Sequence, residues 1–372
     1  MSDALPPQTA PDPPPDPLGV VRALTKPYTG MGESLGRRKW RRVKGMANRN
    51  SNCFHVMSRI CEGVPFFDDM DKEALVLVLR RLAPFCGIKL LTYCVMGNHF
   101  HALIQVPERE AWLQRFAGPD GDVRLMEHLR TLYSKSYVEI LSAQWLRWRM
   151  EGREDRLQAS KAALLKRFCD ISAFGKEVKA RFARWFNKRH ARRGVLWMSR
   201  FRSVLVEGHQ QKSGPTPMDA LKVMAAYIDL NPVRASLVAG AGDYRWSGWT
   251  SALRAEKEAV EGLCEIVGCT AAQWEKGGRA TYQSWVSERR PSEGSEEDSP
   301  TTLLMSRIRG FTVGVAVGSP GFVEAVFDEW RALFGPKRAS GARPLVRKPD
   351  AHPLSRGLRA LRDLREPPPD DT

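Results

Sequence analysis

The segment Asn98–Val106, NHFHALIQV, constrains the fold of this 372-residue chain more than any other stretch. Side chains of a β-strand alternate between its two faces. One face of this segment is wholly apolar and consists of Phe100, Ala102, Ile104 and Val106. The other face carries His99, His101, Leu103 and Gln105. Because an apolar face must be covered, we expect a sheet that packs against helices.

Periodicity and turn residues predict the elements around this strand. Strand patterns cover residues 53–58, 88–95, 100–106 and 201–207, and Gly97 and Asn98 suit a tight hairpin turn. A helix with acids in its first turn begins at Asp68, and residues 112–190 have a helical, basic pattern. Thr216 is the predicted cap of a further helix, which Pro232 ends near Asn231. Ser319 and Pro320 open a short amphipathic helix.

The charge of the chain favours a polyanionic partner. The formal net charge is +16, and residues 147–193 contain 15 Lys or Arg against 5 Asp or Glu. Such a field attracts nucleic acid, although a generically basic protein would show the same balance. We expect phosphate contacts from these basic segments, specifically from Arg181, Arg184, Lys188, Arg189, Arg200 and Arg202.

Cysteine usage and hydropathy indicate a reduced, cytoplasmic protein. The seven cysteines form no CxxC pair and several lie in apolar runs, so we expect reduced core residues. The segment MSDALPPQTAPDPPPDP lacks the basic start and apolar stretch of a signal peptide. The longest apolar run stops at Arg80 and Arg81, so we expect no membrane span.

His99 and His101 are candidate metal ligands because they lie side by side on one strand face. Two surface histidines on an open sheet face would have the same spacing. Imidazole shifts metal preference toward Mn²⁺, Co²⁺ or Zn²⁺, while a site with an added oxygen ligand can use Mg²⁺ weakly. His55 lies on the preceding strand and could line the same face, but as a lone histidine it is interpreted as structural.

Tyr227 is a candidate nucleophile on the helix that precedes Pro232. Tyr227 and Asn231 are four residues apart, so they lie one above the other on that helix. A phenol aimed at a metal-bound phosphate can attack it, and the amide oxygen of Asn231 is the candidate third ligand. A half-buried tyrosine and a helix-ending asparagine would give the same pattern.

Five segments, taken together, resemble the REP-associated tyrosine transposases within the single-tyrosine HUH transposases. They cover roughly residues 50–250 in the family's order: FHVMSR (54–59), YCVMGNHFHALIQVP (93–107), WFNKRHARRGVLWMSRFRSVLVEG (185–208), YIDLNPVRASLV (227–238) and GDYRWSGW (242–249). The resemblance implies an α+β fold, a ferredoxin-like antiparallel sheet with helices on one face. It also implies that His99 and His101 bind Mg²⁺ or Mn²⁺, that Tyr227 is the nucleophile, and that Asn231 completes the site.

The implied activity is cleavage and rejoining of single-stranded DNA that bears hairpins or inverted repeats, through a 5′-phosphotyrosine intermediate. No nucleotide cofactor is needed because the bond energy stays in that intermediate. We expect a cytoplasmic, nucleoid-associated protein and leave a homodimer open. A catalytically retired hairpin-binding regulator is the alternative. Replication or conjugation initiators of the same superfamily use a different order of motifs or paired tyrosines, and no second tyrosine lies one turn from Tyr227. An RNA-binding module would leave the histidines unexplained.

The expected organisation divides the chain into segments of different composition. A Pro-rich disordered tail (1–35) precedes the transposase domain (36–250), which carries a basic helical insert at about 110–190. A helical extension (251–286), a linker (287–301), a small helical module (302–336) and a disordered basic tail (337–372) follow. The region after 260 departs from the family's minimal fold.

Overall fold

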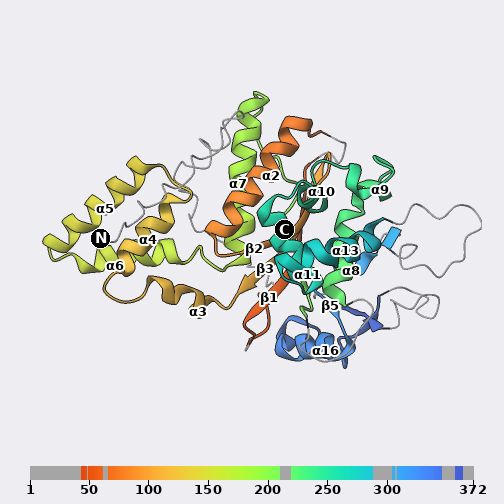
Figure 1. Cartoon of the computed structure of the whole chain (residues 1–372). Coiled ribbons are helices and arrows are strands. Elements are labelled where there is room, and N and C mark those ends of the chain that lie inside the picture. The colour runs from red at the N-terminus through yellow and green to blue at the C-terminus, as the bar shows by residue number, and fades with distance from the viewer. Residues whose placement is uncertain are drawn as a thin grey trace, which may run out of the picture.

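The computed structural model describes residues 43–47, 49–61, 66–209, 219–287, 304–305, 308–345 and 357–362. The predicted tail at residues 1–35, the predicted cap Thr216 and all but the first residue of the predicted linker lie outside these ranges. The fold is a mixed α+β arrangement built around one sheet (Figure 1).

The sheet has seven strands in the order β2-β3-β1-β4-β5-β7-β6. The four strands predicted from the sequence are present as β1 (Ser51–Arg59), β2 (Lys89–Val95), β3 (His99–Pro107) and β4 (Arg202–Val206). Each neighbouring pair among these four strands is antiparallel. The hairpin between β2 and β3 turns at Gly97 and Asn98, as predicted.

Three short strands continue the sheet beyond β4: β5 (Ala316–Gly318), β7 (Arg359–Leu361) and β6 (Arg343–Pro344). The sequence predicts only helices at 302–336 and disorder after 337, and these strands correct both expectations. The physical reason is the edge of β4, whose unpaired backbone groups need partners. Leu205 donates its N–H to the carbonyl of Val315 at 2.8 Å, and β5 pairs parallel to β4.

One face of the sheet packs against α2 (Asp69–Phe85) and α7 (Ile171–Arg189). This is the apolar face predicted from β3, with Phe100, Ala102 and Ile104 in the core. Helix α2 begins where the sequence predicts it, and Asp68 caps α2 and forms a capping box with Asp71. Helix α16 (Pro320–Glu329), capped by Ser319, contributes to the same core.

A helical lobe follows β3 in the chain and precedes α7; the predicted insert at about 110–190 also included α7, which packs against the sheet instead. The lobe is seen on the left of Figure 1 and joins the same core through Leu125, Val138 and Trp145. Its elements are α3 (Arg109–Leu113), η1 (Gln114–Phe116), α4 (Gly121–Arg130), α5 (Lys135–Met150) and α6 (Glu154–Leu165).

Helices also cover the second face, so the expectation of helices on one face only is wrong. Leu103 and Val204 lie in a second core with the elements that follow β4. These are α8 (Ala220–Asp229), α9 (Asn231–Arg234), η2 (Ala241–Asp243), α10 (Gly248–Leu253), α11 (Lys257–Val267), η3 (Trp274–Gly278), α13 (Arg279–Val286) and α15 (Arg309–Val313). The short helix α12 (Ala271–Gln273) follows α11 and buries no residue. The short helix η4 (Arg331–Leu333) follows α16. Apolar positions on the histidine face supply the reason, since they too must be covered.

The cysteines and helices of the described residues fit two further expectations. All seven cysteines are free thiols, and five of them are buried. In the part of the chain that the structure describes, no helix combines the length and apolarity needed to cross a membrane.

Candidate nucleophile and metal site

His99 and His101 lie next to each other on β3, and their ring centroids are 5.1 Å apart. The register places His101 opposite Met57 of β1 and His99 opposite Arg59. The Nδ1 atom of His99 hydrogen-bonds the side-chain oxygen of Asn98 at 2.6 Å. A partner at Nδ1 fixes the ring orientation that a metal-binding imidazole uses, with Nε2 as the ligand atom.

His55 is part of the same cluster, which agrees with the alternative that it lines the histidine face and not with its interpretation as a lone structural residue. Its Nε2 lies 2.8 Å from Nδ1 of His101, and its Nδ1 lies 2.7 Å from the carbonyl oxygen of Phe311. Burial lowers the pKa of His55 to about 4, and burial together with the neighbouring histidines lowers that of His101 well below its ordinary value. Burial thus favours the neutral form of both rings, which is the form that binds metals.

Helix α8 brings Tyr227 to the histidines. Asp219 caps this helix by accepting the N–H of Lys222, in place of the predicted cap Thr216. The ring centroid of Tyr227 lies 6.5 Å from those of both His55 and His101, in edge-on geometry. The phenol ring is only 3% exposed, and Phe311 packs against it at 4.9 Å.

Asn231 follows one turn later, but its oxygen is committed to another group. The side-chain oxygen of Asn231 accepts a hydrogen bond from Arg234 at 2.7 Å. The guanidinium of Arg234 also lies 3.9 Å from the centre of the Tyr227 ring, a cation–π contact. A cation at this oxygen competes with a metal ion, so this arrangement does not present Asn231 as a ligand.

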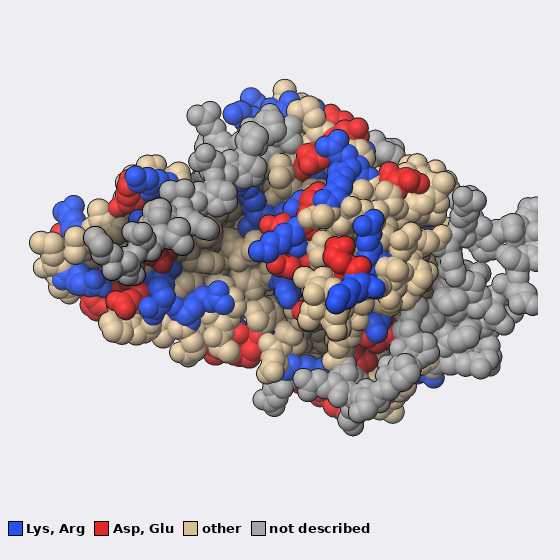
Figure 2. Space-filling view, in the orientation of Figure 1, with Lys and Arg blue, Asp and Glu red and all other residues tan. Residues whose placement is uncertain are grey.

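The predicted DNA contacts divide into buried and exposed groups. Arg181 is 2% exposed and pairs with Glu177 at 2.7 Å, so it is not available to DNA, and its prediction is corrected. Arg189 is bound to Asp68 and Asp71. The remaining cations are exposed, and within the described ranges no ion pair involves them: Arg184, Lys188, Arg200 and Arg202. On the face in Figure 2, cationic and acidic side chains are interspersed.

Arg59 is a residue of this site that sequence reasoning missed. It is exposed and lies opposite His99, while Arg202 lies opposite Met57 on β4. Directly opposed residues of an antiparallel pair share a face, so both arginines lie on the histidine face of the sheet. The signal was the strand alternation itself, because His55, Met57 and Arg59 are two residues apart.

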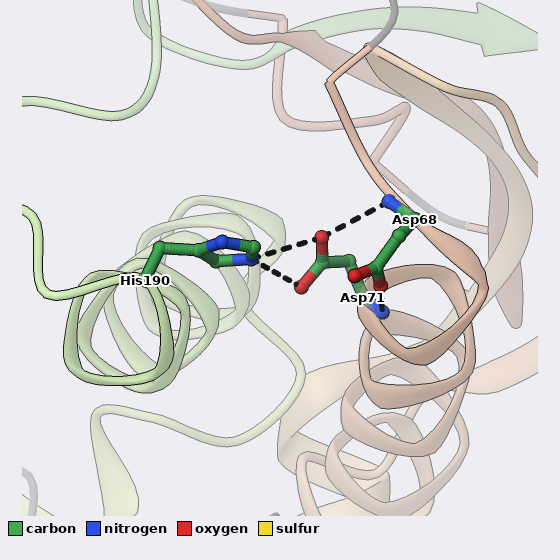
Figure 3. A group of neighbouring side chains, drawn as sticks. All are labelled: Asp68, Asp71 and His190. Atoms are coloured by element: carbon green, nitrogen blue, oxygen red, sulfur yellow. Dashed lines mark hydrogen bonds and ion pairs between the residues drawn. The ribbon is translucent and has the colours of Figure 1, made fainter.

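A second cluster also contains closely spaced potential ligand atoms, but protein groups already hydrogen-bond the carboxylate at its centre (Figure 3). Asp68, Asp71 and His190 have ligand atoms within 4.8 Å of one another. The carboxylate of Asp71 accepts from Arg189 at 2.7 Å and lies 2.9 Å from Nε2 of His190. These contacts join the start of α2 to the end of α7, so the cluster is explained by helix docking.

Two cavities of the described residues lie apart from these groups. A cavity of about 420 Å³ is lined by residues of β2, α11 and α12, including Lys89, Cys264 and Glu265. None of the predicted site residues lines it.

Comparison with known proteins gives one structural likeness. No family model and no curated protein matches the chain. A solved structure of a REP-associated tyrosine transposase bound to a REP hairpin aligns with a TM-score of 0.33 and 12% identity, covering 59% of this chain and 86% of that chain. This TM-score is too low to equate the two folds, so the function proposed below rests on the residues of this chain.

Proposed function

We propose that the chain is a metal-dependent transesterase of the HUH tyrosine transposase type that acts on single-stranded, hairpin-bearing DNA. Tyr227 is the nucleophile, and His99 and His101 hold the divalent cation. The observation that carries the proposal is a convergence of distant segments. Strand β3 and helix α8 place the Tyr227 ring 6.5 Å from that of His101, and His101 in turn lies beside His99.

The connectivity of the first four strands supports the ferredoxin-like fold that this function requires. Helix α2 connects β1 to β2, the hairpin continues into β3, and α7 precedes β4. Their order across the sheet is β2-β3-β1-β4, which is the pattern of a split βαβ arrangement. The C-terminal strands and the second helical layer are additions to that unit.

The donor set fits a divalent cation of intermediate softness. His99 and His101 each have a partner at Nδ1, as metal-binding histidines usually have. A bound cation would polarise the phosphodiester and stabilise negative charge on oxygen. Asn231 becomes a third ligand only if Arg234 releases its oxygen.

The reaction is a balanced exchange of phosphodiester bonds. The phenolic oxygen of Tyr227 attacks phosphorus, a tyrosine–phosphate bond forms, and the bond to the 3′ oxygen breaks. The phenolic proton ends on the released 3′-OH, which can reverse the step at another DNA end. Arg234 fixes the Tyr227 ring and favours negative charge near it. Phe311 must move aside for a phosphate to reach the phenol.

The burial of Tyr227 favours a second candidate function. A hairpin-binding regulator that has lost cleavage would keep the exposed cations and tolerate a phenol that is 3% exposed. Both candidates bind DNA hairpins, and only the transposase forms a covalent adduct.

Adduct formation on hairpin-bearing single strands, with and without Mn²⁺, tests the proposal. The oligonucleotides are copied from inverted repeats that flank the gene, and denaturing gels detect covalent products. We expect an Mn²⁺-dependent adduct, reduced on the order of a thousandfold or more in Tyr227→Phe, because only the nucleophilic oxygen is lost. Tyr137→Phe, in the helical lobe, is the matched control and should keep full activity.

Each outcome separates the candidates. An adduct with Tyr227→Phe would show that another tyrosine is the nucleophile. Hairpin binding without any adduct in the unaltered protein would favour the regulator. Absence of both binding and adduct would exclude the two candidates together.

A further inference from the structure

A chain of buried hydrogen bonds runs from the C-terminal part of the protein to His101. The carbonyl oxygen of Phe311 lies 2.7 Å from Nδ1 of His55, and Nε2 of His55 lies 2.8 Å from Nδ1 of His101. His55 is 0% exposed and His101 is 3% exposed, so water does not compete for these contacts. The planes of the two imidazole rings are inclined by only 18° and their centroids are 5.0 Å apart, so the rings meet through their nitrogen edges.

The direction of each hydrogen bond in this chain follows from the carbonyl group. A carbonyl oxygen only accepts, so Nδ1 of His55 must carry a proton. A neutral imidazole has one N–H group, so Nε2 of His55 has a lone pair and must accept. The donor to that lone pair is Nδ1–H of His101. The lone pair of His101 is therefore on Nε2.

We infer that His55 is a positioning residue that, with the carbonyl of Phe311, holds His101 in the tautomer whose Nε2 lone pair can bind the cation. The inference rests on the proposed function for the cation itself. It gives a role in the site to the C-terminal extension, by which we mean the segment that contains Leu304 and helix α15. Phe311 lies in α15, outside the four-stranded unit. A ring free to exchange tautomers would present an N–H to the metal for part of the time.

Two further contacts tie the same extension to the nucleophile. The carbonyl of Leu304 accepts a hydrogen bond from Arg234 at 2.9 Å, and Arg234 lies over the Tyr227 ring. The ring of Phe311 packs against Tyr227 at 4.9 Å. Leu304 and Phe311 are both fully or almost fully buried. The extension thus contacts the histidine relay and the tyrosine through different atoms.

Nitrogen NMR of the metal-free, full-length protein with labelled histidine tests the relay directly. Long-range nitrogen–carbon-proton correlations distinguish a ring protonated at Nδ1 from one protonated at Nε2. We expect His55 and His101 both to be protonated at Nδ1. In His55→Leu, which fills a similar volume without a lone pair, His101 should shift toward the Nε2–H tautomer that neutral imidazole favours in water.

His55→Gln is the conservative rescue, since its amide can accept from His101 and donate toward Phe311. A second measurement follows Mn²⁺ binding by the loss of the free-ion paramagnetic resonance signal, without DNA. Loss of an outer hydrogen-bond partner typically weakens metal binding by about 10–100-fold, and we expect this for His55→Leu but not for His55→Gln. His128→Leu, which removes a histidine of the helical lobe, is the control.

The two measurements fail in different ways. An Nε2–H tautomer of His101 in the unaltered protein, or an unchanged tautomer in His55→Leu, would overturn the relay. Equal Mn²⁺ affinity of His55→Leu and the unaltered protein would overturn its positioning role. The expected tautomers without any Mn²⁺ binding would support the relay and count against the proposed metal site.

Discussion

Two clusters in this protein combine imidazole with other polar groups, one around His101 on the sheet and one around Asp71 between two helices. In the first, His101 and His99 each form a hydrogen bond through Nδ1. In the second, both carboxylate oxygens of Asp71 have partners: Arg189 and His190 at one, and the N–H of Asp68 at 3.0 Å at the other. The first cluster leaves the Nε2 lone pair of His101 for a ligand, and the second has already used its acceptors.

This difference shows that close spacing of ligand atoms does not by itself define a metal site. The Asp71 cluster has ligand atoms within 4.8 Å, yet a metal ion there would have to displace a guanidinium. Displacing a buried charge partner is costly, because the remaining charge is left unpaired. A candidate metal site therefore differs from a structural contact in whether the ligand atoms still have lone pairs that no protein donor uses.

The strongest way to break the comparison is to remove the imidazoles of the first cluster. His99→Ala and His101→Ala should each lower Mn²⁺ affinity and adduct formation on the order of a hundredfold or more, since each removes a proposed ligand. EDTA should abolish adduct formation by the unaltered protein. His190→Ala is the matched control from the second cluster and should leave both measurements unchanged. Metal-independent cleavage would contradict this prediction.

The second cluster should respond in stability instead of activity. Asp71→Asn keeps the shape of the side chain but removes the buried charge that pairs with Arg189. We expect the free energy of unfolding to fall by about 1–3 kcal/mol, measured by urea denaturation, with Mn²⁺ affinity unchanged. Asp69→Asn is the control, because the Asp69 side chain is 78% exposed and pairs with Lys72 on the helix surface. A loss of Mn²⁺ binding in Asp71→Asn would reverse the assignment of the two clusters.

The sequence predicted the elements whose pattern is local. The strand alternation of β3, the start of α2 at Asp68 and the Ser319 cap of α16 were all predicted from a few neighbouring residues. The second helical layer was missed, although β3 is buried at five consecutive positions from Phe100 to Ile104. His99 and His101 lie on the same face as Leu103, and their polarity suggested from the sequence that this face is not covered by helices.

The site was predictable only in part, for a related reason. His99, His101 and Tyr227 came from short motifs, and the structure brings them together. The contact of His55 with Phe311 spans 256 residues, and no local pattern announces it. Arg181 was miscounted as a DNA contact because a charge tally ignores pairing, although Glu177 four residues earlier on the same helix gave a usable signal.

The exposed cations extend the comparison to DNA binding. They are the predicted DNA contacts that form no ion pair within the described residues, so they can bind phosphate. Replacing Arg184, Lys188, Arg200 and Arg202 together with Gln should flatten the salt dependence of hairpin binding. The slope of log affinity against log salt should fall by roughly 0.7 for each lost phosphate contact with a single strand. Replacing Arg147, Arg149 and Lys161, which pair with Glu151 or Asp122, is the control. An unchanged slope would show that the four cations only face solvent.

A third imidazole, that of His209, gives the smallest expected effect. His209 hydrogen-bonds Asp219 at 2.8 Å, and this contact raises the pKa of His209 above its ordinary value. Asp219 also caps α8, the helix that carries Tyr227. The stabilisation is therefore fully present below the unfolded pKa of about 6.5 and is lost as pH rises through the higher folded pKa.

His209→Gln should remove this pH dependence. Because the pair is partly exposed, we expect the unaltered protein to lose about 1 kcal/mol or less relative to His209→Gln between about pH 5.5 and about pH 8.5. Urea denaturation at the two pH values gives the comparison, and His128→Gln serves as the control. Equal pH slopes for His209→Gln and the unaltered protein would mean that the charge of His209 contributes nothing to stability.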